Sequence, residues 1–398
     1  MSEQVPDYAP GGSSYRRLMI ALPAAGLAAF APLYSPHGLL PVLSRAFDVT
    51  EPTAALAISA GTFGVMLAAL PWAIQADKWG RPRAIKAGLV LAATLGWASL
   101  LAPDLPVLLV IRLVQGMCAS AVPALLIGYL SEQVDRRYTV LAAATYVSGN
   151  TVGGMLGRVI GAPIGVWFGW QVGVGAVNLI ATVATIVVCL ALPPPHAQVA
   201  ALGTVRDTLR LVAMHLRDRA LVAVYAQGFL LFGGFIALYN YLAYRLEGPP
   251  FGLSPALTSL LFLAYLAGTV TSRLSGGWCL TWGRRQVLVG GAVVYLSGVL
   301  LTLIDNVWAI MAGLLVLTGG FFTSQAVANG WSGARPREGT VQSTALYNMG
   351  YYSGAAIIGW ALGFPYRLFG WTGLVVFVAA LIVLAQLLVL TARDLREE

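Results

Sequence analysis

The chain has 398 residues, of which 58% are hydrophobic and only 10% are charged. Soluble globular proteins carry about 25% charged residues, so this composition could not cover a water-exposed surface. The net charge of +8 does not indicate a nucleic-acid-binding protein, because the basic residues lie in short gaps between apolar runs. The composition therefore excludes a soluble enzyme and predicts a chain that crosses a lipid bilayer many times.

Twelve apolar stretches are long enough to cross the bilayer as helices, which takes about 17–25 residues. The predicted spans are 18–43, 53–75, 84–102, 105–131, 138–167, 171–192, 221–244, 255–274, 286–303, 307–329, 340–364 and 371–390. They predict a six-helix bundle over residues 18–192, a second bundle over 221–390, and polar tails at 1–17 and 391–398. In the linker 193–220, arginines alternate with leucines, which predicts a short amphipathic helix on the membrane surface.

The basic residues predict the orientation of the chain in the membrane. Of the 24 lysines and arginines, 19 fall on one side of the predicted spans, three fall on the other, and Arg112 and Arg158 fall within spans. Loops rich in Lys and Arg stay in the cytoplasm. We therefore expect a multi-pass protein of the cytoplasmic (inner) membrane with both termini in the cytoplasm.

The two halves of the chain repeat each other in the same orientation. Trp79-Gly80-Arg81 recurs as Trp282-Gly283-Arg284, 203 residues later, and Phe168-Gly169-Trp170 recurs after 201 residues. Parallel repeats related by an axis along the membrane normal are an established transporter architecture. The repeat predicts two parallel pseudo-symmetric six-helix bundles, with a substrate site near mid-membrane where the halves meet.

The turn after the second predicted span has a compact basic pattern, in which Asp77 is followed by Gly80, Arg81 and Arg83. Glycine provides the backbone freedom that a very short turn needs, and arginines are expected to face cytoplasmic water. A plain basic turn would have the same composition. The partial recurrence of this pattern in the second half favours a functional role instead.

This turn resembles the signature of the major facilitator superfamily between its second and third helices. The family's signature has a glycine, then an aspartate four residues later, then glycine, arginine and a second basic residue. In this chain Ala73 stands in place of the first glycine. In the second copy Leu280 replaces the acid. The resemblance covers nearly the whole chain and implies an all-α membrane protein with the twelve-helix major facilitator fold. It also implies a conformational latch formed by Asp77, Gly80, Arg81, Arg83, Arg284 and Arg285.

Two further segments carry the resemblance. The fourth span contains Arg112 and Gln115, and an arginine inside a span is costly unless it has a function, although its side chain could also extend to the membrane surface. The fifth span resembles the antiporter signature of drug exporters, but Arg158 takes the place of a proline. The pair Gly157-Arg158 and the segment YNYLAYRLEGPPFGLS, residues 239–254, are similar to the acriflavin-sensitivity-type branch of exporters. The helix-packing glycines of this span are Gly149, Gly153, Gly157 and Gly161.

Polar and aromatic residues within the spans are the candidates for substrate contact, because rings with polar tips suit an amphiphilic ligand. The candidates are Tyr34, His37, Arg112, Gln115, Asn150, Arg158, Tyr239, Asn240, Tyr241, Tyr265, Gln325, Tyr347, Asn348 and Tyr351. All 16 Asp and Glu fall in tails, loops or span ends. A proton carrier would therefore be Asp77, His37 or Glu132.

Two functions follow from these features. The first is proton-coupled export of drugs or small amphiphilic metabolites by alternating access. The second is transport of an organic anion or amino-acid-like solute, with Arg158 and Arg112 as the anion clamp. A membrane enzyme or receptor is disfavoured, because the sequence has no phosphate-binding loop, metal-ligand cluster or extramembrane catalytic segment. We expect no cofactor and no metal; the expected partners are a small-molecule substrate, the proton gradient and the lipid bilayer, for a protein that we expect to be a monomer.

Overall fold

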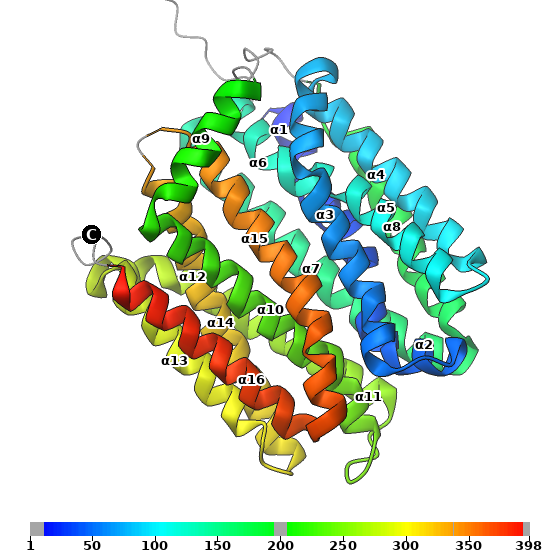
Figure 1. The fold of residues 1–398 in the computed structure, drawn as a ribbon. Helices are drawn as coiled ribbons and strands as arrows, with labels where there is room; N and C mark the ends of the chain where they lie inside the picture. Colours follow the sequence, from blue (N-terminus) through cyan, green and yellow to red (C-terminus); the bar gives the residue numbers. More distant parts are fainter. Residues whose placement is uncertain (1–11, 195–204, 337, 393–398) are drawn as a thin grey trace, which may run out of the picture. The chain divides into compact units, whose positions relative to one another are not determined.

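The computed structural model describes residues 12–194, 205–336 and 338–392 (Figure 1), but not the side chains of residues 77, 136, 137, 140 and 205–207. Within those residues the chain forms sixteen α-helices and three short 3-10 helices. Eleven helical segments are long and apolar enough to cross a membrane. The twelfth predicted span is α15 (Thr340–Ala361), a helix of 22 residues. The predicted twelve-helix architecture is confirmed.

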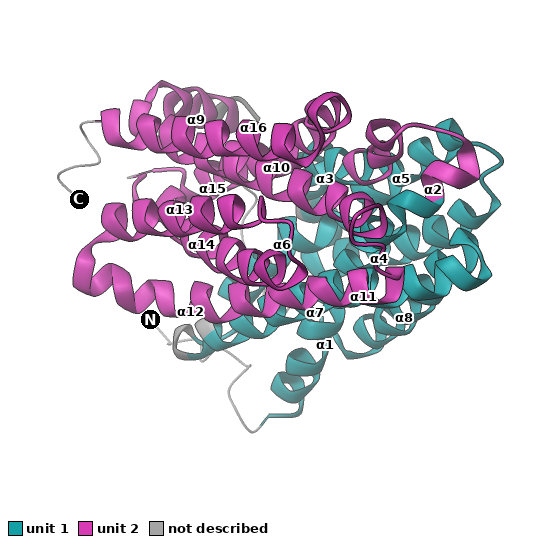
Figure 2. Ribbon diagram, turned by 90° about the horizontal axis from the view of Figure 1, so that it is seen from below, with its two compact units in different colours: residues 1–42, 60–202 teal, residues 43–59, 203–398 magenta. Residues whose placement is uncertain are grey.

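The chain divides into two compact units, Met1–Val42 with Ala60–Leu202 and Leu43–Ser59 with Gly203–Glu398 (Figure 2). We call them unit 1 and unit 2. The helices α2 (Leu40–Phe47) and α3 (Glu51–Trp79) pass from one unit to the other. The remaining helices of unit 1 are α1 (Ser13–Tyr34), η1 (Ser35–Leu39), α4 (Arg81–Ala98), η2 (Ser99–Leu101), α5 (Leu105–Ala119), α6 (Ala121–Gln133), α7 (Arg136–Phe168) and α8 (Trp170–Ala191).

Unit 2 begins with the linker helix and contains the second set of spans. Its helices are α9 (Val205–Arg217), α10 (Arg219–Glu247), α11 (Pro255–Leu260), η3 (Leu261–Ala264), α12 (Tyr265–Trp282), α13 (Arg284–Leu301), α14 (Val307–Ala334), α15 and α16 (Gly363–Thr391). The helix predicted in the linker corresponds to α9, which packs against α10 and α15. The preceding part of the linker, residues 195–204, lies outside the described residues.

The sequence repeat recurs in the backbone conformation. Gly80 and Gly283 both have φ = +81° and begin equivalent helices, α4 and α13. L-amino acids with a side chain rarely adopt this conformation, which explains glycine at both turns. Helices α5 and α14 also start alike, because Asp104 and Asn306 each accept hydrogen bonds from backbone N–H groups of the first turn. Side-chain capping of this kind fixes where a helix begins.

Close helix contacts in each unit depend on glycine. A Cβ atom on Gly157 of α7 would overlap the carbonyl oxygen of Ala31 on α1, and one on Gly153 would lie 2.7 Å from the Cα of Leu27. In unit 2, a Cβ on Gly354 of α15 would overlap the carbonyl oxygen of Phe229 on α10. Small residues let membrane helices approach to backbone contact. The contact loosens toward the end of the predicted stripe, since a Cβ on Gly161 would meet only ordinary neighbours.

Candidate functional site

Prolines interrupt the first span, and the interruption positions two of the predicted site residues. Helix α1 ends at Tyr34, and Pro36 lies at the start of the 3-10 turn η1. Proline has no N–H to continue an α-helix and disfavours helical conformation in the preceding residue. Tyr34 and His37 are buried, and their rings stack with centroids 5.6 Å apart and an interplanar angle of 11°. The sequence predicted a continuous span here, so this turn is a finding of the structure.

Arg158 of α7 packs directly onto this turn. Its Nε donates a hydrogen bond to His37 Nδ1 over 3.0 Å, and its Nη1 donates to the Gly154 carbonyl over 2.8 Å. Its Cζ atom lies 4.4 Å from the centroid of the Tyr34 ring, which is a cation–π geometry. The side chain is only 1% exposed. We call Tyr34, His37, Gly154 and Arg158 the Arg158 cluster.

Arg112 of α5 holds the end of α1 rather than extending to the membrane surface. Its guanidinium donates to the carbonyls of Pro32 and Leu33, over 3.0 and 2.6 Å, and to Gln115 Oε1. In a continuous helix the Pro32 carbonyl would accept from residue 36, but Pro36 has no N–H. Ser35 donates to this carbonyl through its backbone N–H and its Oγ, and Arg112, which is 4% exposed, adds a further donor. Its observed contacts therefore support the interrupted helix.

Unit 2 contains a continuous group of aromatic rings contributed by four helices. We call it the aromatic cluster; its members are Phe232, Phe235 and Tyr239 of α10, Tyr265 of α12, Phe321 and Phe322 of α14, and Tyr351 of α15. Phe232 stacks on Tyr351 with centroids 3.6 Å apart, and Phe235 stacks on Phe321 at 4.1 Å. Phe322 and Tyr351 are half-buried, whereas the other members are buried. These two rings are therefore the accessible part of the cluster.

Several predicted contact residues have their polar tips engaged within unit 2. Tyr239 OH bonds Thr318 Oγ1 over 2.8 Å, and Asn240 Nδ2 donates to the Gly359 carbonyl over 3.0 Å. The hydroxyls of Tyr241 and Tyr347 donate to the backbone carbonyls of residues 360 and 325. The bonds of Tyr239, Asn240 and Tyr241 fasten α10 to α14 and α15, and the bond of Tyr347 fastens α15 to α14. The remaining candidates, Asn150, Gln325 and Asn348, are half-buried.

The residues of the predicted latch divide between the two repeats. In unit 1, Arg81 Nη2 pairs with Glu132 Oε1 over 2.6 Å, which joins the start of α4 to α6. The side chain of Asp77 lies outside the described residues, and Arg83 is exposed. In unit 2, Arg284 is exposed and Arg285 Nη2 donates to the Leu390 carbonyl at the end of α16. The two copies thus share their glycine turn but use their arginines differently.

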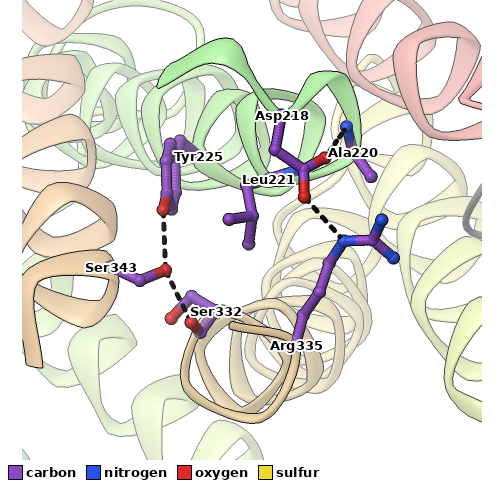
Figure 3. Close-up of polar contacts among 7 residues, drawn as sticks. All are labelled: Asp218, Ala220, Leu221, Tyr225, Ser332, Arg335 and Ser343. Carbon is purple, nitrogen blue, oxygen red and sulfur yellow. Dashed lines mark hydrogen bonds and ion pairs between the residues drawn. The ribbon is translucent and has the colours of Figure 1, made fainter. Parts of the chain in front are cut away.

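A polar network at the start of α10 was not predicted from the sequence (Figure 3). Asp218 accepts hydrogen bonds from the backbone N–H groups of Ala220 and Leu221, and its other oxygen pairs with Arg335 Nε over 3.2 Å. Asp218 therefore caps α10 and ties it to the end of α14. An aspartate directly before a predicted helix is the sequence signal of such a cap, but the pairing with Arg335 depends on the fold.

The same end of unit 2 contains a chain of hydroxyl groups (Figure 3). Tyr225 OH donates to Ser343 Oγ over 2.6 Å, and Ser343 Oγ donates to the Ser332 carbonyl over 2.7 Å. Next to it, His215 Nε2 of α9 donates to the carbonyl of Gly339, over 3.1 Å. These bonds connect the linker helix and the first turns of α10 and α15 with the end of α14.

Replacing Asp218 with alanine is expected to lower the free energy of unfolding by about 1 kcal/mol through loss of the cap. Loss of the partly exposed pair with Arg335 should add about 0–1 kcal/mol. Asp218→Asn keeps a capping oxygen and removes only the ion pair, so it should lie between alanine and wild type. Melting curves of the detergent-purified variants measure both effects. Equal melting temperatures for Asp218→Ala and wild type would contradict the capping role.

Known proteins resemble this chain over nearly its whole length. Residues 22–248 match the family described as Major Facilitator Superfamily. The "Inner membrane transport protein YnfM" of Escherichia coli (strain K12) is 34% identical over 380 residues, which cover 95% of this chain and 90% of that protein. The "Uncharacterized MFS-type transporter YybF" of Bacillus subtilis (strain 168) is 30% identical over 377 residues, with 94% and 93% covered. The crystal structure of a D-xylose-proton symporter superposes with a TM-score of 0.76 at 15% identity, over 95% and 97% of the two chains.

Twelve membrane-crossing helices, a repeat between the halves and these likenesses define a multi-pass membrane transporter and not an enzyme. The family match covers more than half of the chain, and the relatives align with almost all of it. The chain belongs to the major facilitator superfamily.

Proposed function

We propose that this transporter works by alternating access and exports drugs or small amphiphilic metabolites from the cytoplasm in exchange for protons. The observation that carries the proposal is the aromatic cluster of unit 2. Its half-buried rings, Phe322 and Tyr351, lie on helices that also carry the half-buried amides of Gln325 and Asn348. Aromatic faces with a few polar groups beside them are the usual lining of sites for amphiphilic ligands.

The proposed setting is the cytoplasmic membrane, with both termini in the cytoplasm and the protein acting as a monomer. The excess of Lys and Arg on one side of the spans supports this orientation. One relative is named an inner membrane transport protein. We further propose that Asp77, Gly80 and Arg81, together with Arg83, Arg284 and Arg285, form a conformational latch. The ion pair of Arg81 with Glu132 supports a role for the first turn in holding helices together.

A second candidate function is transport of an organic anion, with Arg158 as the clamp. The supporting observation is that Arg158 is only 1% exposed and lies inside α7, within a candidate membrane span. A buried guanidinium is well suited to bind a carboxylate or phosphate. Arg112 supports this candidate less, because its donors contact Pro32, Leu33 and Gln115.

Uptake into proteoliposomes with an acidic interior should distinguish the two functions. We expect vesicles that contain the protein to accumulate ethidium, an aromatic cation, while protons leave, and we expect a protonophore to abolish the accumulation. Empty vesicles are the control for leakage. Benzenesulfonate, an aromatic anion whose charge does not titrate in this range, is the matched probe. Uptake of benzenesulfonate without uptake of ethidium would replace drug export with the organic-anion function.

A further inference from the structure

His37 occupies a position that fixes its protonation state in this structure. Its side chain is fully buried in η1, and its Nδ1 atom accepts the hydrogen bond from Arg158 Nε over 3.0 Å. A neutral imidazole has one acceptor nitrogen, and an imidazolium has none. Nδ1 is therefore unprotonated, and His37 is neutral while this bond exists.

Arg158 is held in place from three directions at once. Besides His37, its guanidinium contacts the Gly154 carbonyl over 2.8 Å and the face of the Tyr34 ring, 4.4 Å from the centroid. The Tyr34 and His37 rings lie parallel, at 11°, next to the cation. The guanidinium is planar and its donors point in fixed directions, so it fits these three partners in one geometry. A change in the protonation of His37 therefore alters the hydrogen bonding of Arg158.

Most titratable residues of the described helices that pack against η1 lie far from His37 along those helices. These helices include α1, α7 and α8. Tyr34 of α1 and Arg158 of α7 face the imidazole, and α8 contains one titratable residue, Cys189, close to its far end. The other titratable residues of α1 and α7 lie at least three helical turns away along their helices; they are Tyr15, Arg16, Arg17, Arg136, Arg137, Tyr138 and Tyr146.

We propose that His37 is the proton-binding group of the transport cycle and that Arg158 is the residue that responds to its charge. This inference rests on the proposed proton-coupled transport. When a proton from the aqueous phase binds, one N–H bond forms at Nδ1 and the acceptor for Arg158 Nε is lost. Two cations then face each other in a buried site, where their repulsion is much stronger than in water. Arg158 must leave Nδ1, and it returns when the proton is released.

The proposal accounts for a feature of the sequence that the export function leaves unexplained. Proton-driven transporters commonly place an ionisable residue inside the membrane, yet all 16 Asp and Glu of this chain fall in tails, loops or span ends. Histidine is the side chain that ordinarily titrates near neutral pH. In the described structure, His37 is the histidine buried within a membrane-spanning segment, and Arg158 Nε lies 3.0 Å from its Nδ1 atom.

The test separates proton coupling from substrate binding. Asparagine at position 37 places an amide oxygen where Nδ1 lies, so His37→Asn can still accept from Arg158 but cannot take up a proton. We expect this variant to melt within a few degrees of wild type and to exchange external for internal ethidium without a gradient. It should lose accumulation driven by the pH gradient, by at least about tenfold. His215→Asn, which alters a histidine bonded to the Gly339 carbonyl of the other unit, is the matched control and should keep coupling.

The outcomes distinguish this inference from the proposed function. If wild-type protein shows no proton-coupled transport, the proposed function fails. If wild type is coupled and folded His37→Asn keeps gradient-driven accumulation, the proton site is elsewhere and the inference is overturned. A second measurement uses ¹⁵N-histidine labelling of the wild-type sequence, which has only three histidines. With signals assigned through His196→Asn and His215→Asn, His37 should appear as the Nε2–H tautomer and become imidazolium over the pH range of coupling; a His37 that stays neutral there would also overturn the proposal.

Discussion

Replacing Gly157 with alanine is expected to reduce the yield of folded protein and to lower its melting temperature. The added Cβ would overlap the carbonyl oxygen of Ala31, which is backbone and cannot rotate away. Helices α1 and α7 would have to separate, and overpacking of this kind costs about 1–3 kcal/mol or more. Gly354→Ala in unit 2 should behave in the same way, because its Cβ would overlap the Phe229 carbonyl oxygen. Thermal unfolding of the purified variants measures the loss.

A matched control exists in α12. A Cβ on Gly277 would meet nothing within 4 Å, although this glycine is also inside a helix. Alanine is the better helix former by about 0.8–1 kcal/mol, so Gly277→Ala should be neutral or slightly stabilising. The same substitution is therefore expected to have opposite signs at two helical positions. A wild-type melting temperature for Gly157→Ala would show that the α1–α7 contact adjusts without cost.

The contrast between these glycines shows what the sequence could and could not predict about packing. Spacing of four residues in the fifth span predicted a close helix contact, because residues four apart share a helix face. It did not identify α1 as the partner, and it gave equal weight to Gly161, where a Cβ would meet only ordinary neighbours. The spacing of residues defines the surface of one helix, whereas a contact depends on the shapes of both helix surfaces.

The number of spans followed from the sequence because hydrophobic length is a strong signal in membranes. The span that corresponds to α15 was predicted as well, because residues 340–364 form an apolar stretch long enough to cross the membrane. The interruption of the first span was not predicted. Pro36 removes one hydrogen bond, and proline alone is tolerated in membrane helices when neighbours satisfy the freed carbonyl. Here Ser35 donates to that carbonyl, and Arg112 of α5 adds a further donor whose position is set by tertiary packing.

The candidate site was predicted as a set of residue types rather than as an arrangement. Arg158, His37 and Tyr34 were all selected as polar or aromatic residues within spans, because rings with polar tips suit an amphiphilic ligand and a charge within a span is costly. Their contact brings together positions 121 residues apart in the chain, which no local pattern encodes. For the same reason the pair of Asp218 with Arg335, 117 residues apart, was missed.

Arg158→Lys is expected to lower transport by at least about tenfold, which corresponds to about 1.4 kcal/mol. Lysine keeps the charge but carries its three donors on one nitrogen, so it cannot reproduce the planar fork that bonds His37 Nδ1 and the Gly154 carbonyl from two nitrogens while covering the Tyr34 ring. Arg158→Gln removes the charge and should lower transport further. Initial rates of ethidium uptake, measured beside the melting temperature of each variant, give the two effects separately.

Arg112→Lys is the matched comparison, because it changes a second buried arginine whose observed contacts are structural. Lysine carries its donors on one nitrogen and cannot span the Pro32 and Leu33 carbonyls and Gln115 Oε1 as the guanidinium does, and an unsatisfied buried polar group costs about 1–3 kcal/mol. We therefore expect Arg112→Lys to lose mainly stability and Arg158→Lys to lose mainly transport. Unchanged affinity for ethidium and benzenesulfonate, with a lowered melting temperature, would assign Arg158 to structure as well. A loss of affinity for benzenesulfonate but not for ethidium would instead make Arg158 an anion clamp. Substitution of Arg158 moves or removes a positive charge, and that charge attracts an anion but not a cation.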